Sequence, residues 1–402
     1  MTNASSYRFI WRLHMWAGLF LIPFIILLSL TGSIYLFKPQ LDRWEERDMR
    51  GLNTENSVSA EAQLSVVMKQ YPDAQFHSYR LPENKGDAAM VHVALPHNGG
   101  MRDIYVSPAG DIIASHDPEK RISATVARIH GSLLLGKFGS ILVEIAAIFA
   151  IMMILSGIYL WWPRTAGRHQ HYAGILWPRL KNGVRIFWRD LHAVTGFWVA
   201  GLALILLFSG LPWTDNVGAG IKYIRAQMGW VDAKPQNWSG GGIKENVDMH
   251  VDAHGGHDHD AMLKAQAEAK KIRDLPPKKG LNDIVILASK ENMPFPAIIQ
   301  PPHAPARFGP PNGDVWKLSS EAQNRTLNRT ILYDKNSGAI VKESSFADKH
   351  IADKIINYGI AWHEGQLFGW INQLIGLFTA LALITISISG IKMWWRKRPK
   401  SK

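Results

Sequence analysis

The sequence of 402 residues contains no cysteine. Disulfide bonds, zinc–cysteine sites, iron–sulfur clusters and covalently attached c-type haem all need cysteine, so these features are excluded. The glycine-rich patterns of P-loop and dinucleotide-binding proteins are also missing from the chain. A redox centre would therefore need nitrogen, oxygen or thioether ligands, for which the 16 histidines are the first candidates. Its electron donor would be a quinol or a cytoplasmic or membrane partner protein, and not bound NAD(P)H.

Only 19% of the residues are charged, and four stretches are nearly free of charge for long enough to span a bilayer, which takes about 20 helical residues. They cover residues 15–37, 139–162, 192–213 and 367–395. No small-residue cleavage site follows the first stretch, so we interpret it as a retained helix, with a cleaved export signal as the alternative. The sequence therefore predicts an α-helical membrane protein with four transmembrane helices.

Lysine and arginine gather in three segments that four spans would place on one side of the membrane. They are the residues before the first span in region 1–37, the loop 163–191 between the second and third spans, and the residues after the fourth span in region 367–402. Because basic loops and tails stay in the cytoplasm, both termini are predicted to be cytoplasmic. The net charge of +12 then reflects topology and contact with anionic membrane lipid. It predicts no nucleic-acid binding, since no compact basic domain is present.

Two longer polar segments, 38–138 and 214–366, would lie together on the external side. In the first, residues 60–70 have helical spacing, and alternating apolar residues predict a hairpin over 103–114. A similar hairpin is predicted over 330–341 in the second segment. We therefore predict two external α+β domains, one in each segment.

The two halves of the chain repeat one pattern. A histidine at the start of the first or third span has a glycine 18 residues later, and a histidine before the second or fourth span has a glycine 27 residues later. The first spacing joins His14 to Gly32 and His192 to Gly210, and the second joins His130 to Gly157 and His363 to Gly390. The chain is thus a predicted duplication of one helix–domain–helix unit, and parallel repeats of this kind place sites at their interface.

Topology sorts the four repeated histidines into two pairs. His14 and His192 would lie near the cytoplasmic face and His130 and His363 at the external face, with about 30 Å of hydrocarbon between the two levels. Two histidine pairs at different depths, without cysteine, favour two b-type haems, each with two axial histidines. Glycines four or six residues after these histidines would leave room for the macrocycles; they are Gly18, Gly196, Gly136 and Gly369.

Arginines near each pair are candidates for binding the haem propionates. They are Arg12 and Arg189 at the inner level and Arg128 at the outer level. Two alternatives stay open, because interfacial histidines can simply bind headgroups or helix ends and paired histidines can hold zinc or copper. The metal alternative is less favoured, since two imidazoles are an incomplete ligand set and no carboxylate repeats with them.

Two features occur in only one half of the chain. The His-rich loop 250–260 is a weak metal-binding candidate, with a solvated insertion as the favoured interpretation. Its histidines are His250, His254, His257 and His259. Glu144 lies inside the second span, where a carboxylate is costly, and is a candidate for proton or cation handling. The alternative is that its side chain reaches the nearby external boundary.

The repeated motifs resemble those of the PepSY-associated transmembrane family, and within it the inner-membrane ferric-siderophore reductases. They are Leu13-His14 with Gly18, Leu191-His192 with Gly196, Ile129-His130 with Gly136 and Gly139, and the Ser-Gly-Ile-(x)2-Trp-Trp endings at 156–162 and 389–395. The resemblance covers the whole chain. It implies two PepSY-like periplasmic modules, a four-helix core with two haem b groups, and a multi-pass location in the bacterial inner membrane.

The same resemblance implies an oxidoreductase that reduces a ferric siderophore at the periplasmic face. Siderophores hold Fe(III) through hard oxygen donors far better than Fe(II), so one electron releases the metal. Two alternatives remain. One is a non-enzymatic membrane protein whose external domains bind peptide, lipid or metal, and the other is a quinone-linked haem protein of another purpose.

Overall fold

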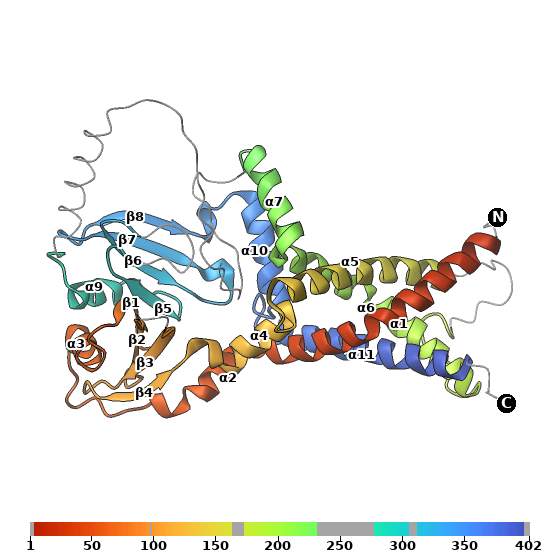
Figure 1. Cartoon of the computed structure of the whole chain (residues 1–402), viewed down its shortest axis with the longest axis horizontal. Helices are drawn as coiled ribbons and strands as arrows, with labels where there is room; N and C mark the ends of the chain where they lie inside the picture. Colours follow the sequence, from red (N-terminus) through yellow and green to blue (C-terminus); the bar gives the residue numbers. More distant parts are fainter. Residues whose placement is uncertain (1–3, 97–98, 163–172, 231–276, 305–311, 398–402) are drawn as a thin grey trace.

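Four long helices form a bundle at one end of the molecule, and a β-sheet lies at the other end (Figure 1). The computed structural model describes residues 4–96, 99–162, 173–230, 277–304 and 312–397. The long helices are α1 (Ala4–Tyr35), α5 (Gly136–Trp161), α6 (Val184–Gly210) and α11 (Trp370–Lys397). Each is long and apolar enough to cross a membrane, which confirms the four predicted spans by length and composition.

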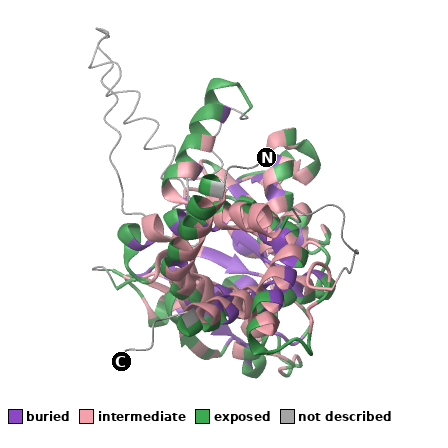
Figure 2. Cartoon of the chain, turned by 90° about the vertical axis from the view of Figure 1, so that its right-hand side faces the viewer, coloured by how far each residue is buried: buried purple, intermediate pink, exposed green. Residues whose placement is uncertain are grey.

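The surface of this bundle is apolar. Bulky side chains such as Phe20, Phe208 and Phe378 are more than half exposed on it. Seen from the bundle end, buried residues gather in the sheet behind the helices (Figure 2). A large exposed apolar surface needs an apolar environment, so the bundle is the membrane part of a multi-pass protein.

The sheet is one continuous antiparallel structure of eight strands in the order β4-β3-β2-β1-β5-β6-β7-β8. The first polar segment supplies β1 (Gln75–Arg80), β2 (Ala89–Ala94), β3 (Met101–Val106) and β4 (Ile112–His116). The second supplies β5 (Ala297–Gln300), β6 (Val315–Ser320), β7 (Arg329–Asp334) and β8 (Ile340–Ser345). Both predicted hairpins are present.

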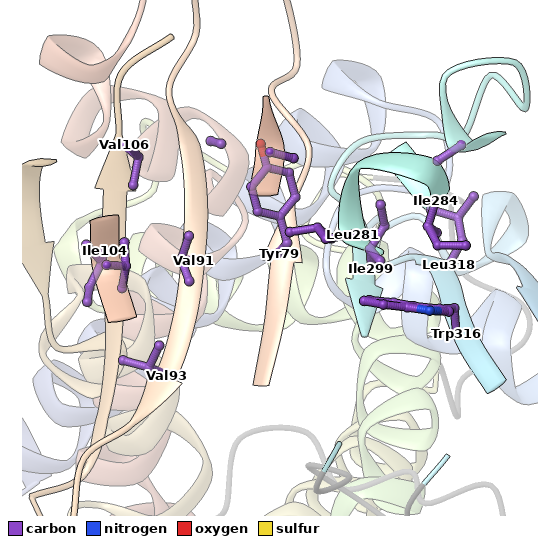
Figure 3. Packing of buried hydrophobic residues seen from close by; sticks show 14 of the residues in the cluster. Tyr79, Val91, Val93, Ile104, Val106, Leu281, Ile284, Ile299, Trp316 and Leu318 are labelled. Atoms are coloured by element: carbon purple, nitrogen blue, oxygen red, sulfur yellow. The ribbon is translucent and has the colours of Figure 1, made fainter. Parts of the chain in front are cut away.

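The strands of the two predicted external domains form one shared sheet, because β1 and β5 pair and join the two segments. Tyr79 lies opposite Ile299 at this seam. Helices α3 (Ala60–Gln70), as predicted, and α9 (Leu281–Ala288) cover the same face of the sheet, one from each half. Their apolar side chains share one core with strands of both halves (Figure 3). Pairing at the seam removes two open strand edges, which neither half could protect alone.

Shorter helices connect the sheet to the bundle. Helix α4 (Ile122–Ser132) leads from β4 to α5, and α10 (Ile351–His363) leads from β8 to α11. The others are α2 (Lys38–Glu45) after α1 and α7 (Asp215–Gln227) after α6. Short 3-10 helices are η1 (Arg47–Met49), η2 (Pro118–Lys120), η3 (Leu211–Trp213), η4 (Arg325–Leu327) and η5 (Phe346–Asp348).

The two chain ends lie together at the end of the bundle that faces away from the sheet (Figure 1). The described residues 173–183, which lead into α6, lie at the same end. Part of the predicted loop 163–191 is helical, since Arg185 and Arg189 lie in the first turns of α6. Which compartment faces each end stays a prediction.

Candidate functional site

The bundle brings four histidines together in two pairs. We call His14 (α1) and His192 (α6) the inner pair, because they lie toward the chain ends. His130 (α4) and His363 (α10) form the outer pair, toward the sheet. The ring centroids are 6.4 Å apart in the inner pair and 6.2 Å apart in the outer pair, with interplanar angles of 86° and 73°. The structure thus joins the pairs expected from the duplication, and their role as haem ligands stays a prediction.

The ring spacing suits a metal ion between two imidazoles. Because a metal–imidazole bond is about 2.0 Å long, two rings that bind one ion from opposite sides have centroids about 6 Å apart. Within the described residues, no three His, Asp or Glu side chains converge to hold a metal ion. The pairs therefore match a group that needs two protein ligands. The His-rich loop 250–260 lies outside the described residues.

Hydrogen bonds orient both rings of the inner pair. The His14 Nδ1 lies 2.9 Å from the Ser156 Oγ, which itself donates to the Met153 carbonyl oxygen and so accepts from the ring. The His192 Nδ1–H donates to the Ile386 carbonyl oxygen over 3.0 Å. Both rings carry their proton on Nδ1, which leaves the lone pair of Nε2 available.

The outer pair is oriented in the same way. The His363 Nδ1–H donates to the Leu206 carbonyl oxygen over 2.9 Å. The His130 Nδ1–H donates over 3.0 Å to the Thr31 Oγ1, which donates to the Leu27 carbonyl oxygen. Burial, and next the neighbouring His363, lower the pKa of His130 to about 4. Burial lowers the pKa of His363 as well. Both rings are neutral near pH 7, which is the form that binds a metal.

A glycine lies against each of the four rings. A Cβ atom added to Gly32 would lie 3.1 Å from the His130 Cε1, and one added to Gly210 would lie 3.1 Å from the His363 Cε1. The inner rings lie against Gly157 and Gly390. Each glycine follows a serine or threonine that contacts the same ring. Each long helix therefore contacts one imidazole through a dipeptide of Ser or Thr followed by Gly, which we call a hydroxyl–glycine seat. The sequence marked these four glycines as repeats but did not reveal their contact with the rings.

The glycines predicted to border the macrocycles have other surroundings. Gly18 has the Met153 side chain beside it. An added Cβ would meet no atom within 4 Å at Gly196, Gly136 or Gly369. Their role beside a macrocycle stays a prediction.

The two pairs lie at different depths. His14 and Gly32 are 18 residues apart on α1, and Gly32 contacts His130. At 1.5 Å per residue, this separates the two pairs by about 27 Å along the helix. The distance is close to the thickness of a bilayer core, which is about 30 Å.

The arginines predicted to bind propionates have other neighbours. Arg189 forms an ion pair of 2.6 Å with Asp190. Arg128 lies 3.7 Å from Glu119, and Arg12 is exposed. Propionate binding by these three arginines stays a prediction.

Glu144 caps another helix. It is buried and accepts hydrogen bonds from the backbone N–H groups of Asn216 and Val217, at 3.1 and 2.8 Å. The Asn216 side-chain amide donates a third bond of 3.0 Å. These backbone groups begin α7, so the carboxylate satisfies them and interacts favourably with the helix dipole. The contact accounts for the buried carboxylate, and proton or cation handling by it stays untested.

Sequence reasoning missed a group of four side chains near the C-terminal end of α10. We call Trp213, Gln323, Arg325 and Glu364 the junction cluster. Burial raises the pKa of Glu364 to about 7, against the opposing effect of Arg325. These residues come from distant segments and belong to no repeated motif, so the sequence carried no signal for the cluster.

A family model described as the PepSY-associated TM region matches residues 11–397. The matched range includes all four paired histidines, both halves of the duplication and all eight strands. A comparison with curated proteins finds no match.

Proposed function

Because the chain belongs to the PepSY-associated transmembrane family, we propose that it carries electrons across the membrane through two b-type haems and reduces a Fe(III)-siderophore on the side of the sheet. The observation that carries this proposal is the pairing of imidazoles at 6.4 and 6.2 Å near the two ends of one bundle. Two such pairs about 27 Å apart along the helix would give one electron a path across most of the bilayer.

The chain's own residues would hold the haems rigidly. A b-type haem bound by two imidazoles supplies reversible one-electron transfer. His14 and His192 would hold the inner haem, and His130 and His363 the outer haem. The hydroxyl–glycine seats keep each ring in one tautomer and one orientation, so the ligand geometry changes little when an electron arrives.

The outer pair lies at the end of the bundle that is nearer the sheet. Helices α4 and α10 carry the outer histidines and follow β4 and β8 in the chain. A ferric siderophore beside the sheet would thus approach the outer haem without entering the bundle. One electron converts Fe(III) to Fe(II), which hard oxygen donors hold weakly, and the metal is released. The electron donor on the other side would be a quinol or a partner protein.

Haem content tests the first part of this proposal. We expect about two haem b per chain by pyridine haemochrome analysis. His14→Ala and His192→Ala should remove the same spectral component, and His130→Ala and His363→Ala the other. His303→Ala, outside both pairs, should keep both components. Purified protein without haem, after growth with adequate haem, would favour the non-enzymatic alternative.

Stopped-flow mixing tests the reaction. Reduced protein mixed with a panel of ferric siderophores should be reoxidised while chelatable Fe(II) appears at one iron per electron. Reoxidation by oxygen or quinone alone, with every ferric siderophore inert, would contradict the proposal and favour a quinone-linked haem protein.

A further inference from the structure

The junction cluster contains five buried side-chain atoms that have no hydrogen-bond partner among the described residues. They are the Trp213 Nε1, the Gln323 Nε2 and Oε1, the Arg325 Nε and the Glu364 Oε2. Buried polar atoms in folded proteins are almost always satisfied, and exceptions indicate a missing water, ion or ligand. Several such atoms in one place therefore indicate a polar ligand of the cluster.

The four side chains lie close together although they come from three segments. The Arg325 Cζ is 5.1 Å from the centroid of the Trp213 ring. The Gln323 amide lies close enough to the Glu364 carboxyl to lower its pKa, although the two groups do not reach hydrogen-bond geometry. Arg325 interacts with the same carboxyl. Helix η4, which begins with Arg325, packs against α10, which ends directly before Glu364.

The cluster borders the outer pair. Glu364 follows His363 in the chain, and its carboxylate is buried. Trp213 lies three residues after Gly210, which contacts the His363 ring. A ligand that reaches the cluster would therefore lie beside the group held by the outer histidines.

Three members of the cluster suit an anionic oxygen ligand, and the fourth, Glu364, is a carboxyl that interacts with Arg325. Trp213 offers an N–H donor, Gln323 an amide, and Arg325 a permanent cation with a planar set of donors. Arginine is the residue that best matches a carboxylate, because two parallel hydrogen bonds form between the planar groups. In the first half, Gly131 follows His130, so glycine stands at the position that Glu364 has in the second half.

We propose that the junction cluster binds the propionate carboxylates of the outer haem, with Arg325 as the charged anchor. This inference rests on the proposed function. It assigns the main outer propionate contact to Arg325, in place of the predicted Arg128, an α4 residue whose guanidinium lies 3.7 Å from the Glu119 carboxylate.

The test is the rate at which the outer haem leaves the purified protein for excess apomyoglobin, followed by its spectrum. Arg325→Gln removes the charge and keeps much of the side-chain length. We expect it to release the outer haem about tenfold faster or more, since a charge-assisted hydrogen bond is worth at least one factor of ten. The inner haem should stay at full occupancy, which verifies the fold. Arg47→Gln, which removes an exposed arginine of η1, is the matched control and should release both haems at the wild-type rate.

Esterified haem tests whether the carboxylates are the groups recognised. Protein prepared without haem would be titrated with haem and with its propionate dimethyl ester. Arg325→Gln should weaken binding of haem and leave binding of the dimethyl ester unchanged. Equal weakening of both, or wild-type release of the outer haem from Arg325→Gln, would overturn the inference.

A free carboxylate is the other source of this ligand chemistry. Weaker citrate binding by Arg325→Gln, with haem retention unchanged, would show that the cluster serves a soluble ligand and would also overturn the inference. Wild-type protein that contains no haem would instead refute the proposed function, so the two failures are distinguishable.

Discussion

Each paired imidazole is held by two small residues on a neighbouring helix. The hydroxyl or carbonyl oxygen accepts from Nδ1, and glycine leaves space for the ring at van der Waals distance. Small residues let transmembrane helices approach closely, and here the approach positions a ligand atom. A methyl group added at one of these glycines should therefore move the adjacent imidazole ring more than it distorts the helix.

Gly210→Ala tests this at the outer pair. Its Cβ would lie 3.1 Å from the His363 Cε1, so the ring must move by a few tenths of an ångström. We expect an altered spectrum or several-fold lower occupancy of the outer haem, with the inner haem unchanged. Gly201→Ala, on the same helix and with nothing within 4 Å, is the matched control. If the outer haem had the same spectrum in both variants, Gly210 would not position the His363 ring.

At the scale of elements, the Glu144 carboxylate joins α5 to the start of α7. Glu144→Ala leaves backbone donors of α7 without their charged partner, at a cost of about 1–3 kcal/mol. We expect faster hydrogen exchange of the Asn216 and Val217 amides and unchanged haem spectra. Glu119→Ala, which removes a half-exposed carboxylate outside the bundle, should leave this exchange as in the wild type. Unchanged exchange in Glu144→Ala would exclude the capping role.

Glu46, at the start of η1, forms hydrogen bonds with two strands of the sheet. From these bonds we predict that the stability of the sheet depends on pH. Glu46 accepts bonds of 3.0 and 2.9 Å from Arg80 and one of 2.9 Å from Tyr105. Burial alone would raise the pKa of Glu46, but Arg80 and Arg121 outweigh it and lower the pKa to about 2. Since the folded-state pKa lies below the unfolded value, the stabilisation is complete above about pH 4.5 and is lost as the pH falls toward 2.

We expect this pH-dependent stabilisation to be about 3 kcal/mol. Thermal unfolding of the sheet, measured from about pH 5 downward, should show a steeper loss of stability in the wild type than in Glu46→Gln. Asp48→Asn, which removes an exposed carboxylate of η1, should keep the wild-type slope. Equal slopes in the wild type and Glu46→Gln would contradict the role of Glu46.

For the whole molecule, the distribution of Lys and Arg predicts the orientation in the membrane. A reporter fused to the C-terminus should be cytoplasmic, and one inserted at Ser337, in the turn between β7 and β8, should be external. Alkaline phosphatase should be active only at Ser337, and a fluorescent protein should fluoresce only at the C-terminus. The opposite pattern would reverse the direction of electron transfer in the proposed function.

The sequence by itself determined the features that depend on local pattern or on repetition. Long apolar runs predict membrane helices, because each span must satisfy its own backbone hydrogen bonds. Alternation predicted the hairpins, and equal spacings from histidine to glycine predicted which histidines meet, because duplicated units place equivalent residues face to face.

Only the tertiary structure decided how distant segments contact one another. The pairing of Tyr79 with Ile299 merges two predicted domains into one sheet, although nothing near either residue signals the other. The seats of the imidazoles, the capping of α7 by Glu144 and the junction cluster are further examples. Each depends on side chains from separate elements, whose packing free energy belongs to the folded chain and not to any local segment of its sequence.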